Sequence, residues 1–297
     1  NVTGANASGS AARMLAVNRG ELKIGIGEES VDTYRIFFGP KRYSLLSSKE
    51  YASYKIDTIL DGFVLTKWLG IAFEQLIFLF YGVISNFGIV IILVTILVKI
   101  LLHPLTNKSF VSMRKMQLIQ PKLAALKEQF KGDPKRLNEE MMKMYKKEGV
   151  NPMGGCLPML LQLPIFIALY QVLPRLADLK NVSFLWINDL SSPDTVTTIE
   201  AFRDIPLLPY NLNILPIIMT VFSVWQTRLT TPGSAAGQDQ MQKQQSKMMM
   251  LMPIMFLFLF WNMPSGLVLY WTVQTVVSIG QQVYINRKYS AVPVATK

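Results

Sequence analysis

Four long stretches without a charged residue constrain this chain more than any other feature of its sequence. They run from Gln75 to Val98, Gly149 to Pro174, Ile205 to Thr227 and Met248 to Asn286, and they hold 24, 26, 23 and 39 residues. A helix needs about 20 apolar residues to cross the hydrocarbon core of a bilayer. The longest stretch exceeds one span and is interrupted by Asn262-Met263-Pro264-Ser265-Gly266, which is a turn pattern. The sequence therefore predicts five transmembrane helices.

The remaining segments predict an all-α polytopic membrane protein with a small β remnant at its N-terminus. Residues 56–85 mix Asp61, Lys67 and Glu74 with aromatic residues, which is typical of an amphipathic helix lying in the membrane interface. Short strand-like runs in residues 1–55 indicate the end of an extracytoplasmic β domain and a linker. We expect spans at 86–105, 153–175, 209–228, 248–262 and 264–286, with loops at 106–150, 176–208 and 229–247 and a tail at 287–297.

The distribution of charge orients these spans. The chain carries a net charge of +11 although only 16% of its residues are charged. Residues 104–148, 228–247 and 287–297 together carry +11, residues 1–85 and 175–204 together carry −1, and Lys99 supplies the rest. Because basic loops stay in the cytoplasm, the first group is predicted to be cytoplasmic and the N-terminal segment to lie outside. Residues 1–50 contain no signal peptide or apolar run, so we expect a membrane segment or a signal upstream of Asn1.

The first cytoplasmic loop is predicted to form a basic helical hairpin around Gly132-Asp133-Pro134. Apolar residues follow spacings of three and four on both sides of this turn, which is typical of two packed helices. Two interpretations of the basic faces stay open, a solvated loop that sets topology and touches anionic lipid, or a docking arm for RNA or an acidic protein. Aromatic residues are sparse, so no specific nucleic-acid sequence is expected to be read. The candidate docking residues are Arg114, Lys115, Lys122, Lys127, Lys135 and Arg136.

Lys99 is the charged residue that lies inside a predicted span. Its ammonium either snorkels to the cytoplasmic interface or faces a water-filled pocket. Thr95 lies one helical turn earlier, and other spans contain Gln162, Gln226, Thr227, Gln274 and Ser278. These polar residues either line such a pocket or hydrogen-bond between helices. No acidic residue lies within a predicted span, so the anion that pairs with Lys99 is expected to come from a visiting molecule.

Several function classes are excluded by composition. With one cysteine, Cys156, and one histidine, His103, the chain holds no internal disulfide and no His-paired catalytic or metal site. An intramembrane protease is disfavoured because no span holds an aspartate or a nucleophile with its base. A small-molecule or anion transporter is the alternative function, although no inverted repeat is visible. We predict no cofactor, no metal and no enzymatic activity.

Two longer motifs occur in and beside the predicted spans. The first runs from Asn151 to Pro158 (NPMGGCLP) and continues through Gln162-Leu163-Pro164-Ile165-Phe166, and the second is Pro264-Ser265-Gly266-Leu267-Val268-Leu269-Tyr270-Trp271. Both motifs resemble the signature of the YidC/Oxa/Alb membrane protein insertases. Phe38-Gly39-Pro40 and His103-Pro104-Leu105-Thr106 add supporting matches, and Gln281-Gln282 follows near the end of the last span. The similarity covers about residues 36–288 in the family's order, so the chain resembles a bacterial member of this family.

The resemblance implies a five-helix core with a hydrophilic groove that opens to the cytoplasm and to lipid. In such a core Lys99 is the basic residue of the groove, and Thr95, Gln162 and Gln274 line it. A hydrophobic slide, where a nascent segment leaves, is formed by Leu157, Leu163, Phe166, Leu259, Tyr270 and Trp271. The implied function is to insert nascent membrane proteins into the bacterial inner membrane and help them fold, alone or with the Sec translocon (SecYEG, SecDF). The implied partners are nascent membrane proteins, the ribosome, the translocon and anionic lipid.

Overall fold

The computed structural model describes residues 42–49, 64–151, 154, 157–200, 211–230 and 240–290. Residues from Pro40 onward form one compact unit. The strand-like runs expected within residues 1–55 lie outside the described ranges, which hold only the short helix α1 (Tyr43–Leu46) from that segment. We therefore describe the helical unit alone.

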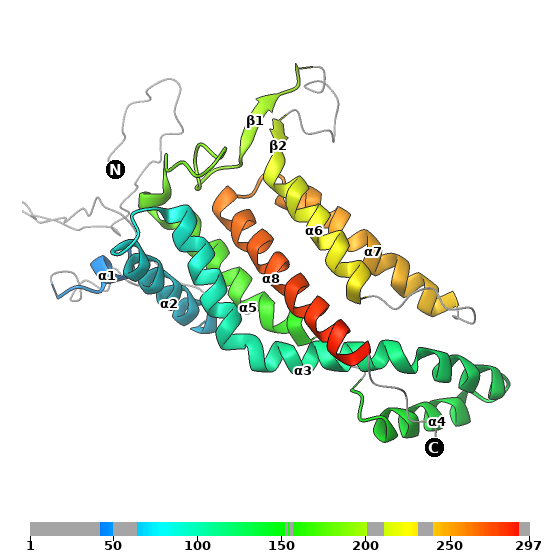
Figure 1. Ribbon diagram of the computed structural model, residues 1–297. Coiled ribbons are helices and arrows are strands. Elements are labelled where there is room, and N and C mark those ends of the chain that lie inside the picture. The colour runs from blue at the N-terminus through cyan, green and yellow to red at the C-terminus, as the bar shows by residue number, and fades with distance from the viewer. Residues whose placement is uncertain are drawn as a thin grey trace, which may run out of the picture. The chain divides into compact units, whose positions relative to one another are not determined.

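The described part of the chain is mostly helical (Figure 1). The longer helices are α2 (Val64–Tyr81), α3 (Phe87–Gln129), α4 (Pro134–Lys147), α5 (Leu157–Val172), α6 (Ile214–Thr230), α7 (Gln240–Phe260) and α8 (Ser265–Ser290). Two 3-10 turns, η4 (Leu173–Arg175) and η5 (Ala177–Leu179), follow α5, and the strands β1 (Thr195–Thr198) and β2 (Asn211–Asn213) form an antiparallel pair. Helix α8 packs against both α3 and α6, while α5 packs against α2 and α7 against α6.

Helix α3 continues through Pro104, where the sequence predicts the end of the first span. Asn86 caps its start by accepting the main-chain N–H of Ile89 at 3.1 Å. A proline inside a helix removes one backbone hydrogen bond and bends the helix without always ending it. The Thr106 hydroxyl donates to the Leu102 carbonyl oxygen at 3.0 Å in the same turn. Figure 1 shows the result, since α3 changes direction and its second half crosses the foot of the bundle.

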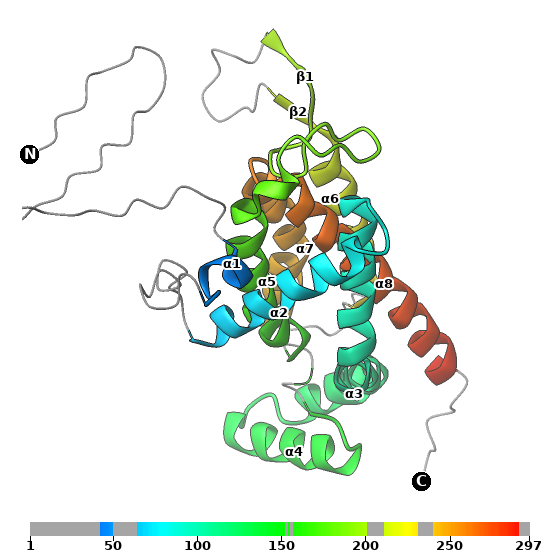
Figure 2. The same ribbon diagram turned by 90° about the vertical axis from the view of Figure 1, so that its left-hand side faces the viewer.

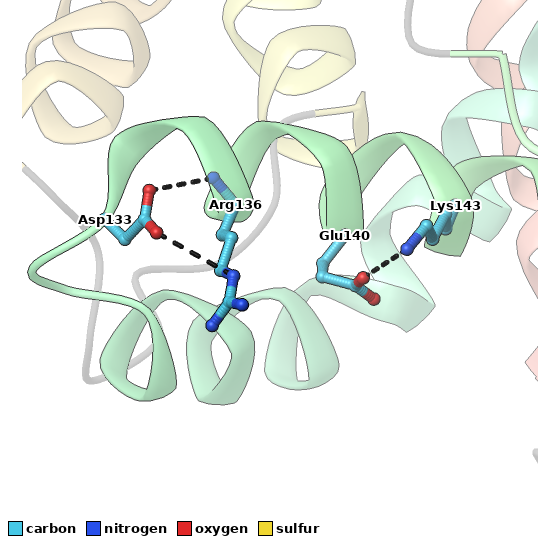
Figure 3. A network of polar contacts seen from close by, with 4 residues as sticks. All are labelled: Asp133, Arg136, Glu140 and Lys143. Atoms are coloured by element: carbon cyan, nitrogen blue, oxygen red, sulfur yellow. Dashed lines mark hydrogen bonds and ion pairs between the residues drawn. The ribbon is translucent and has the colours of Figure 1, made fainter.

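The second half of α3 and helix α4 form the hairpin beneath the bundle (Figures 1 and 2). Their shared core consists of Ile119, Leu123 and Val150, packed against Met116, Met141, Met144 and Tyr145. The turn lies at Gly132-Asp133-Pro134, and Asp133 caps α4 by accepting the main-chain N–H of Arg136 at 3.1 Å. Figure 3 shows this cap and the exposed Lys143–Glu140 pair one turn later on α4. A proline at the first helical position and an aspartate cap both favour a helix start here.

The opposite end of the bundle, which we call the far end, is covered by residues 173–200 and strand β2 (Figure 1). The main-chain N–H groups of Ser265 and Gly266, at the start of α8, donate to the carbonyl oxygens of Ser192 (2.8 Å) and Leu190 (2.9 Å). The buried carboxylate of Asp194 accepts the main-chain N–H of Leu215 on α6 at 2.6 Å. Burial raises the pKa of the Asp194 carboxyl above its usual value, although the N–H donors oppose that effect.

Two of the described helices, Phe87–Gln129 and Leu157–Arg175, are long and apolar enough to cross a membrane. The apolar helices Ile214–Thr230 and Lys247–Phe260 are shorter than this length criterion requires. Helix α8 has 26 residues, but Gln274, Ser278, Gln281 and Gln282 reduce its apolar character. The helical architecture is therefore as predicted, while the number of five spans stays a prediction.

Candidate functional site

Five helices surround a central cavity of about 470 Å³. Each of α3, α5, α6, α7 and α8 contributes side chains to its wall. Near the hairpin end its lining includes Met113 of α3, Thr230 of α6 and Met249 of α7. The polar lining residues are Lys99, Thr106, Gln162, Gln226, Thr227, Thr230, Gln274 and Ser278.

Lys99 on α3 places its ammonium against α8. Its Nζ donates to the Ser278 hydroxyl oxygen at 2.6 Å, and that hydroxyl donates to the Gln274 carbonyl oxygen at 2.8 Å. Within the described ranges Lys99 forms no ion pair with a carboxylate. A lysine ammonium has three N–H donors. The site therefore has the capacity to bind an anion or another acceptor from outside the chain.

A second polar pair joins α5 to α8. The Gln162 side chain on α5 donates from Nε2 to the Tyr270 hydroxyl on α8 at 2.9 Å. One turn further along α8, the side-chain oxygen Oε1 of Gln274 is buried and has no hydrogen-bond partner among the described residues. Burying an acceptor without a donor costs about 1–3 kcal/mol. The cavity wall thus carries the Lys99 ammonium and the hydrogen-bonded Gln162–Tyr270 pair, while the side-chain oxygen of Gln274 is itself buried.

An apolar rim borders these polar groups. The Trp271 ring of α8 lies 5.4 Å from the Phe166 ring and 5.2 Å from the Phe260 ring, centroid to centroid. Leu163 on α5 and Leu259 on α7 line the cavity, yet they are 55% and 51% exposed. Side chains that both line a cavity and face outward mark its opening, so the cavity opens sideways between α5 and α7. An apolar side opening suits contact with lipid or with an apolar helix.

Comparisons with known proteins agree with this architecture. A family model described as 60Kd inner membrane protein matches residues 79–292. That range covers the cavity and the hairpin.

This chain belongs to the 60Kd inner membrane protein family.

Individual proteins similar to this chain are named membrane protein insertase YidC. The membrane protein insertase YidC of Syntrophus aciditrophicus (strain SB) is 41% identical over 263 residues, which is 88% of this chain and 44% of that protein. The YidC of Geobacter sulfurreducens is 39% identical over 274 residues, which is 91% of this chain and 46% of that protein. The chain thus spans less than half the length of these curated relatives. A crystal structure of an active YidC insertase with its first transmembrane domain resolved matches with a TM-score of 0.53 and 29% identity, over 82% of this chain and 53% of that one.

The fold of this 60Kd family member brings most of the predicted groove and slide residues to one cavity. Its lining includes Lys99, Gln162, Leu163, Phe166, Leu259, Tyr270, Trp271 and Gln274. Thr95 is not in the lining, because it is buried and its hydroxyl donates to the Ile91 carbonyl oxygen of its own helix at 2.6 Å. Leu157, the first residue of α5, also lies outside the lining and is 37% exposed.

Ser278, which the sequence analysis noted among the polar span residues but did not assign to the groove, also lines the cavity. It lies four residues after Gln274 on α8, so both side chains face the same direction. That spacing is visible in the sequence, so Ser278 could have been assigned to the groove together with Gln274. The contact with Lys99 joins residues 179 positions apart, and no local pattern encodes it.

The hairpin of this 60Kd family member uses several predicted docking residues internally. Lys122 pairs with Glu148 at 2.7 Å, and Arg136 lies 3.9 Å from the Asp133 carboxylate. Arg114 donates to the Gln117 side-chain oxygen at 3.0 Å. Lys115 is half-buried and Lys135 exposed, and neither forms an ion pair in the part of the chain that the structure describes. Lys115 and Lys135 therefore remain available to an external anion.

Proposed function

We propose that this chain forms the core of a membrane protein insertase, which inserts nascent membrane proteins and helps them fold. The observation that carries the proposal is the position of Lys99. Its ammonium lacks a carboxylate partner among the described residues and lines a mainly apolar cavity that carries several polar side chains and opens sideways between α5 and α7. Relatives named YidC insertases support this function, and they do not favour the transporter alternative.

The proposed mechanism needs neither ATP nor a covalent intermediate. A cavity within the bilayer that holds a charged group and several polar side chains shortens the low-dielectric path that the polar end of a substrate must cross. Lys99 attracts acidic groups on that end, while Gln162 and Gln274 offer hydrogen bonds along the way. The apolar segment leaves over Leu163, Phe166, Leu259 and Trp271 into lipid. Burial of its apolar surface in lipid supplies the driving force.

The proposed topology has five spans in the bacterial inner membrane. Helices α3 and α5 meet the length and hydropathy of a span, and we assign α6, α7 and α8 as the other three. Helix α2 lies in the interface. The hairpin, the 229–247 loop and the tail are cytoplasmic because they carry the basic excess. The far end then faces the periplasm, and residues 1–55 belong to a periplasmic segment.

The proposed partners follow from the same arrangement. We assign three partners to the hairpin, namely nascent membrane proteins, the ribosome and anionic lipid. Lys115 and Lys135 provide positive charge for these contacts. The Sec translocon is a fourth proposed partner, for substrates whose insertion requires it. Phosphate contacts by lysine do not read a nucleotide sequence, so ribosomal RNA fits this surface only as a polyanion.

Insertion by the purified full protein in proteoliposomes tests the proposal. The substrate is a single-span protein whose translocated end carries either two aspartates or two asparagines. We expect Lys99→Ala to slow insertion of the aspartate form about tenfold and to leave the asparagine form within about twofold, since the lost attraction is worth roughly 1.4 kcal/mol. Lys99→Arg, which keeps the charge, serves as the matched control. Equal insertion of the aspartate form by Lys99→Ala would refute the role of charge, and no insertion by the unaltered protein would refute the function.

A further inference from the structure

A two-residue turn at the far end presents two apolar side chains to the outside. The main-chain N–H groups of Phe184 and Ile187 each donate to the carbonyl oxygen of the other at 2.9 Å, so Leu185 and Trp186 form the turn between them. Leu185 is 73% exposed and Trp186 is 42% exposed. By contrast, the Ile187 side chain is buried and Phe184 packs against the core. We call this turn the Leu185-Trp186 tip.

The backbone of Leu185 is locally unfavourable for a leucine. Its φ is +54°, which lies in the left-handed region. Two-residue turns with such a φ usually hold Gly, Asn or Asp, because the Cβ of other residues is crowded there. The Leu185 side chain is mostly exposed, so packing within the described chain offsets little of this cost. A strained residue that gains little from its own chain indicates a contact outside it.

Two contacts hold the tip at the level of the first turns of α3 and α6. The Phe184 ring lies on the backbone of Gly88, the second residue of α3, where a Cβ would come within 2.1 Å of the ring. The Trp186 indole N–H donates to the Asp194 carboxylate at 3.3 Å, and the same carboxylate oxygen accepts the N–H of Leu215 on α6. Helix α3 is long and apolar enough to cross a membrane. Its first turn therefore lies where the hydrocarbon core meets the head groups.

The composition of the tip suits that border. Tryptophan is enriched there because its ring is apolar and its N–H is polar. In Trp186 the N–H already bonds to Asp194, so the exposed part of the ring needs no further polar partner. Residues 181–188 (NVSFLWIN) contain no charged side chain, which disfavours a charged partner. On α3, Ile89 follows Gly88 and is itself exposed, so apolar surface continues from the tip to the span.

We propose that the Leu185-Trp186 tip inserts into the lipid interface and anchors the far end of the bundle there. Leu185 contacts the upper part of the acyl chains, and the Trp186 ring lies at the level of the head groups. In the proposed topology this is the outer leaflet. The inference goes beyond the proposed insertase function and rests on α3 crossing the membrane. The anchor fixes the depth at which α3 and α6 begin.

The first experiment measures the proximity of three sites to lipid. It uses the full protein without native cysteines, with Cys156→Ser, and a single cysteine in place of Leu185, Leu101 or Thr197 that carries the fluorophore NBD. Phosphatidylcholine nanodiscs with and without a nitroxide near the top of the acyl chains are compared. The exposed Leu101 on α3 is the positive control. The exposed Thr197 is the negative control, since β1 projects beyond the helix ends (Figures 1 and 2).

We expect the nitroxide to quench the label at 185 at least about half as strongly as the label at 101 and several times more strongly than the label at 197, because interfacial residues lie within reach of the upper acyl chains. This pattern would support the proposal.

The second experiment needs no label and compares Leu185→Asp with Leu185→Asn. Both new side chains suit a positive φ, so their melting temperatures should agree within about 1 °C if the site faces water. An ionised carboxylate is penalised more than an amide in the lipid interface. We therefore expect Leu185→Asp to melt about 2–4 °C below Leu185→Asn at pH 7 in phosphatidylcholine nanodiscs. Val196→Asp and Val196→Asn, on the exposed face of β1, are the matched control and should differ by less than about 1 °C.

Two results would overturn the inference and leave the insertase function intact. One is quenching at 185 that is no stronger than at 197, and the other is equal melting temperatures for the two Leu185 variants. Either would assign the tip to water or to another protein. Absence of quenching at 101 would instead contradict α3 as a membrane span, and with it both the proposed function and this inference.

Discussion

Lys99 and Ser278 join α3 to α8 through a hydrogen bond of 2.6 Å between the ammonium nitrogen and the hydroxyl oxygen. The two helices pack along each other, and Ser278 is 2% exposed. The bond fixes the position of the Lys99 ammonium along α8 within the cavity. It also satisfies one donor of an ammonium that has no carboxylate partner in the described part of the chain.

Ser278→Ala should weaken the packing of α3 on α8. A hydrogen bond to a charged group contributes about 1.5–3 kcal/mol, so we expect a loss of that order in the free energy of unfolding. The loss should shrink to below about 0.5 kcal/mol in a Lys99→Met background, because the coupled partner is then absent. Unfolding in detergent of the two single variants and the double variant measures this coupling. Additive single effects would show that the contact contributes nothing.

Phe260 and Phe258 provide a matched pair on α7. Phe260 is 1% exposed and packs against Phe166 and Trp271, whereas Phe258 is 61% exposed. We expect Phe260→Ala to lower the free energy of unfolding by about 3–5 kcal/mol, the cost of a large cavity in a core. Phe258→Ala should cost less than about 1 kcal/mol. Thermal unfolding followed by tryptophan fluorescence gives both values, and similar losses for the two variants would contradict the assigned packing.

Glu74 should make stability depend on pH. Its carboxylate is buried on α2, where it accepts the main-chain N–H of Tyr43 at 3.0 Å and faces Arg42 and Asp178. Burial raises the pKa of Glu74 above its ordinary value of 4.5, although the Tyr43 N–H and the Arg42 charge oppose that effect. The folded state then binds more protons than the unfolded state above pH 4.5, so stability falls as pH rises through the raised pKa.

Glu74→Gln should remove this loss of stability with rising pH, because a glutamine side chain does not titrate. Its amide oxygen still accepts the main-chain N–H of Tyr43. We expect a higher Tm for the variant than for the unaltered protein at pH 7 and a smaller difference at pH 4.5. Melting temperatures between pH 4 and pH 8 in detergent test this. Glu139→Gln, on the exposed face of α4, is the control and should leave the profile unchanged. A profile unaltered by Glu74→Gln would exclude Glu74 as its source.

Gln117 should protect the last turn of α6. Its Nε2 donates to the carbonyl oxygens of Thr230 (2.8 Å) and Leu229 (3.2 Å), which have no partner within their own helix. We expect Gln117→Leu to speed amide hydrogen exchange across residues 223–230 about threefold to tenfold, as the loss of a neutral hydrogen bond implies. The exposed Gln129→Leu, at the end of α3, is the control. Unchanged exchange would show that the cap is dispensable.

Much of the fold could be predicted because the relevant patterns are local. Uncharged stretches marked the apolar helices, and the seam through Ile119 and Leu123 marked a packed hairpin whose turn lies at Pro134. The continuation of α3 through Pro104 could not be predicted in this way. A proline ends some helices and bends others, and the packing of α3 against α8 favours the second outcome.

The candidate site was predicted less completely than the helices, for geometric reasons. Thr95 lies four residues before Lys99, but its hydroxyl bonds to Ile91 and does not line the cavity. Helical spacing predicts only roughly which face of a helix a side chain lies on. The packing of neighbouring helices determines what that side chain contacts. Ser278 does line the cavity, but its hydrogen bond with Lys99 depends on helix α3, which lies far away in the sequence.

Two of the hydrogen bonds that attach the far end to α8 join main-chain atoms, and a third runs from the Ser265 hydroxyl to the Asp189 carbonyl oxygen at 2.8 Å. The oxygens of Leu190 and Ser192 accept the N–H groups of Gly266 and Ser265, and none of these four atoms belongs to a side chain. Substitutions at 190 and 192 leave such bonds in place as long as the backbone keeps its path. These two bonds therefore do not depend on which side chains stand at 190 and 192. The fully buried Leu190 side chain and the buried Asp194 carboxylate restrict the sequence of the cover in a second way, through packing and a side-chain bond to α6.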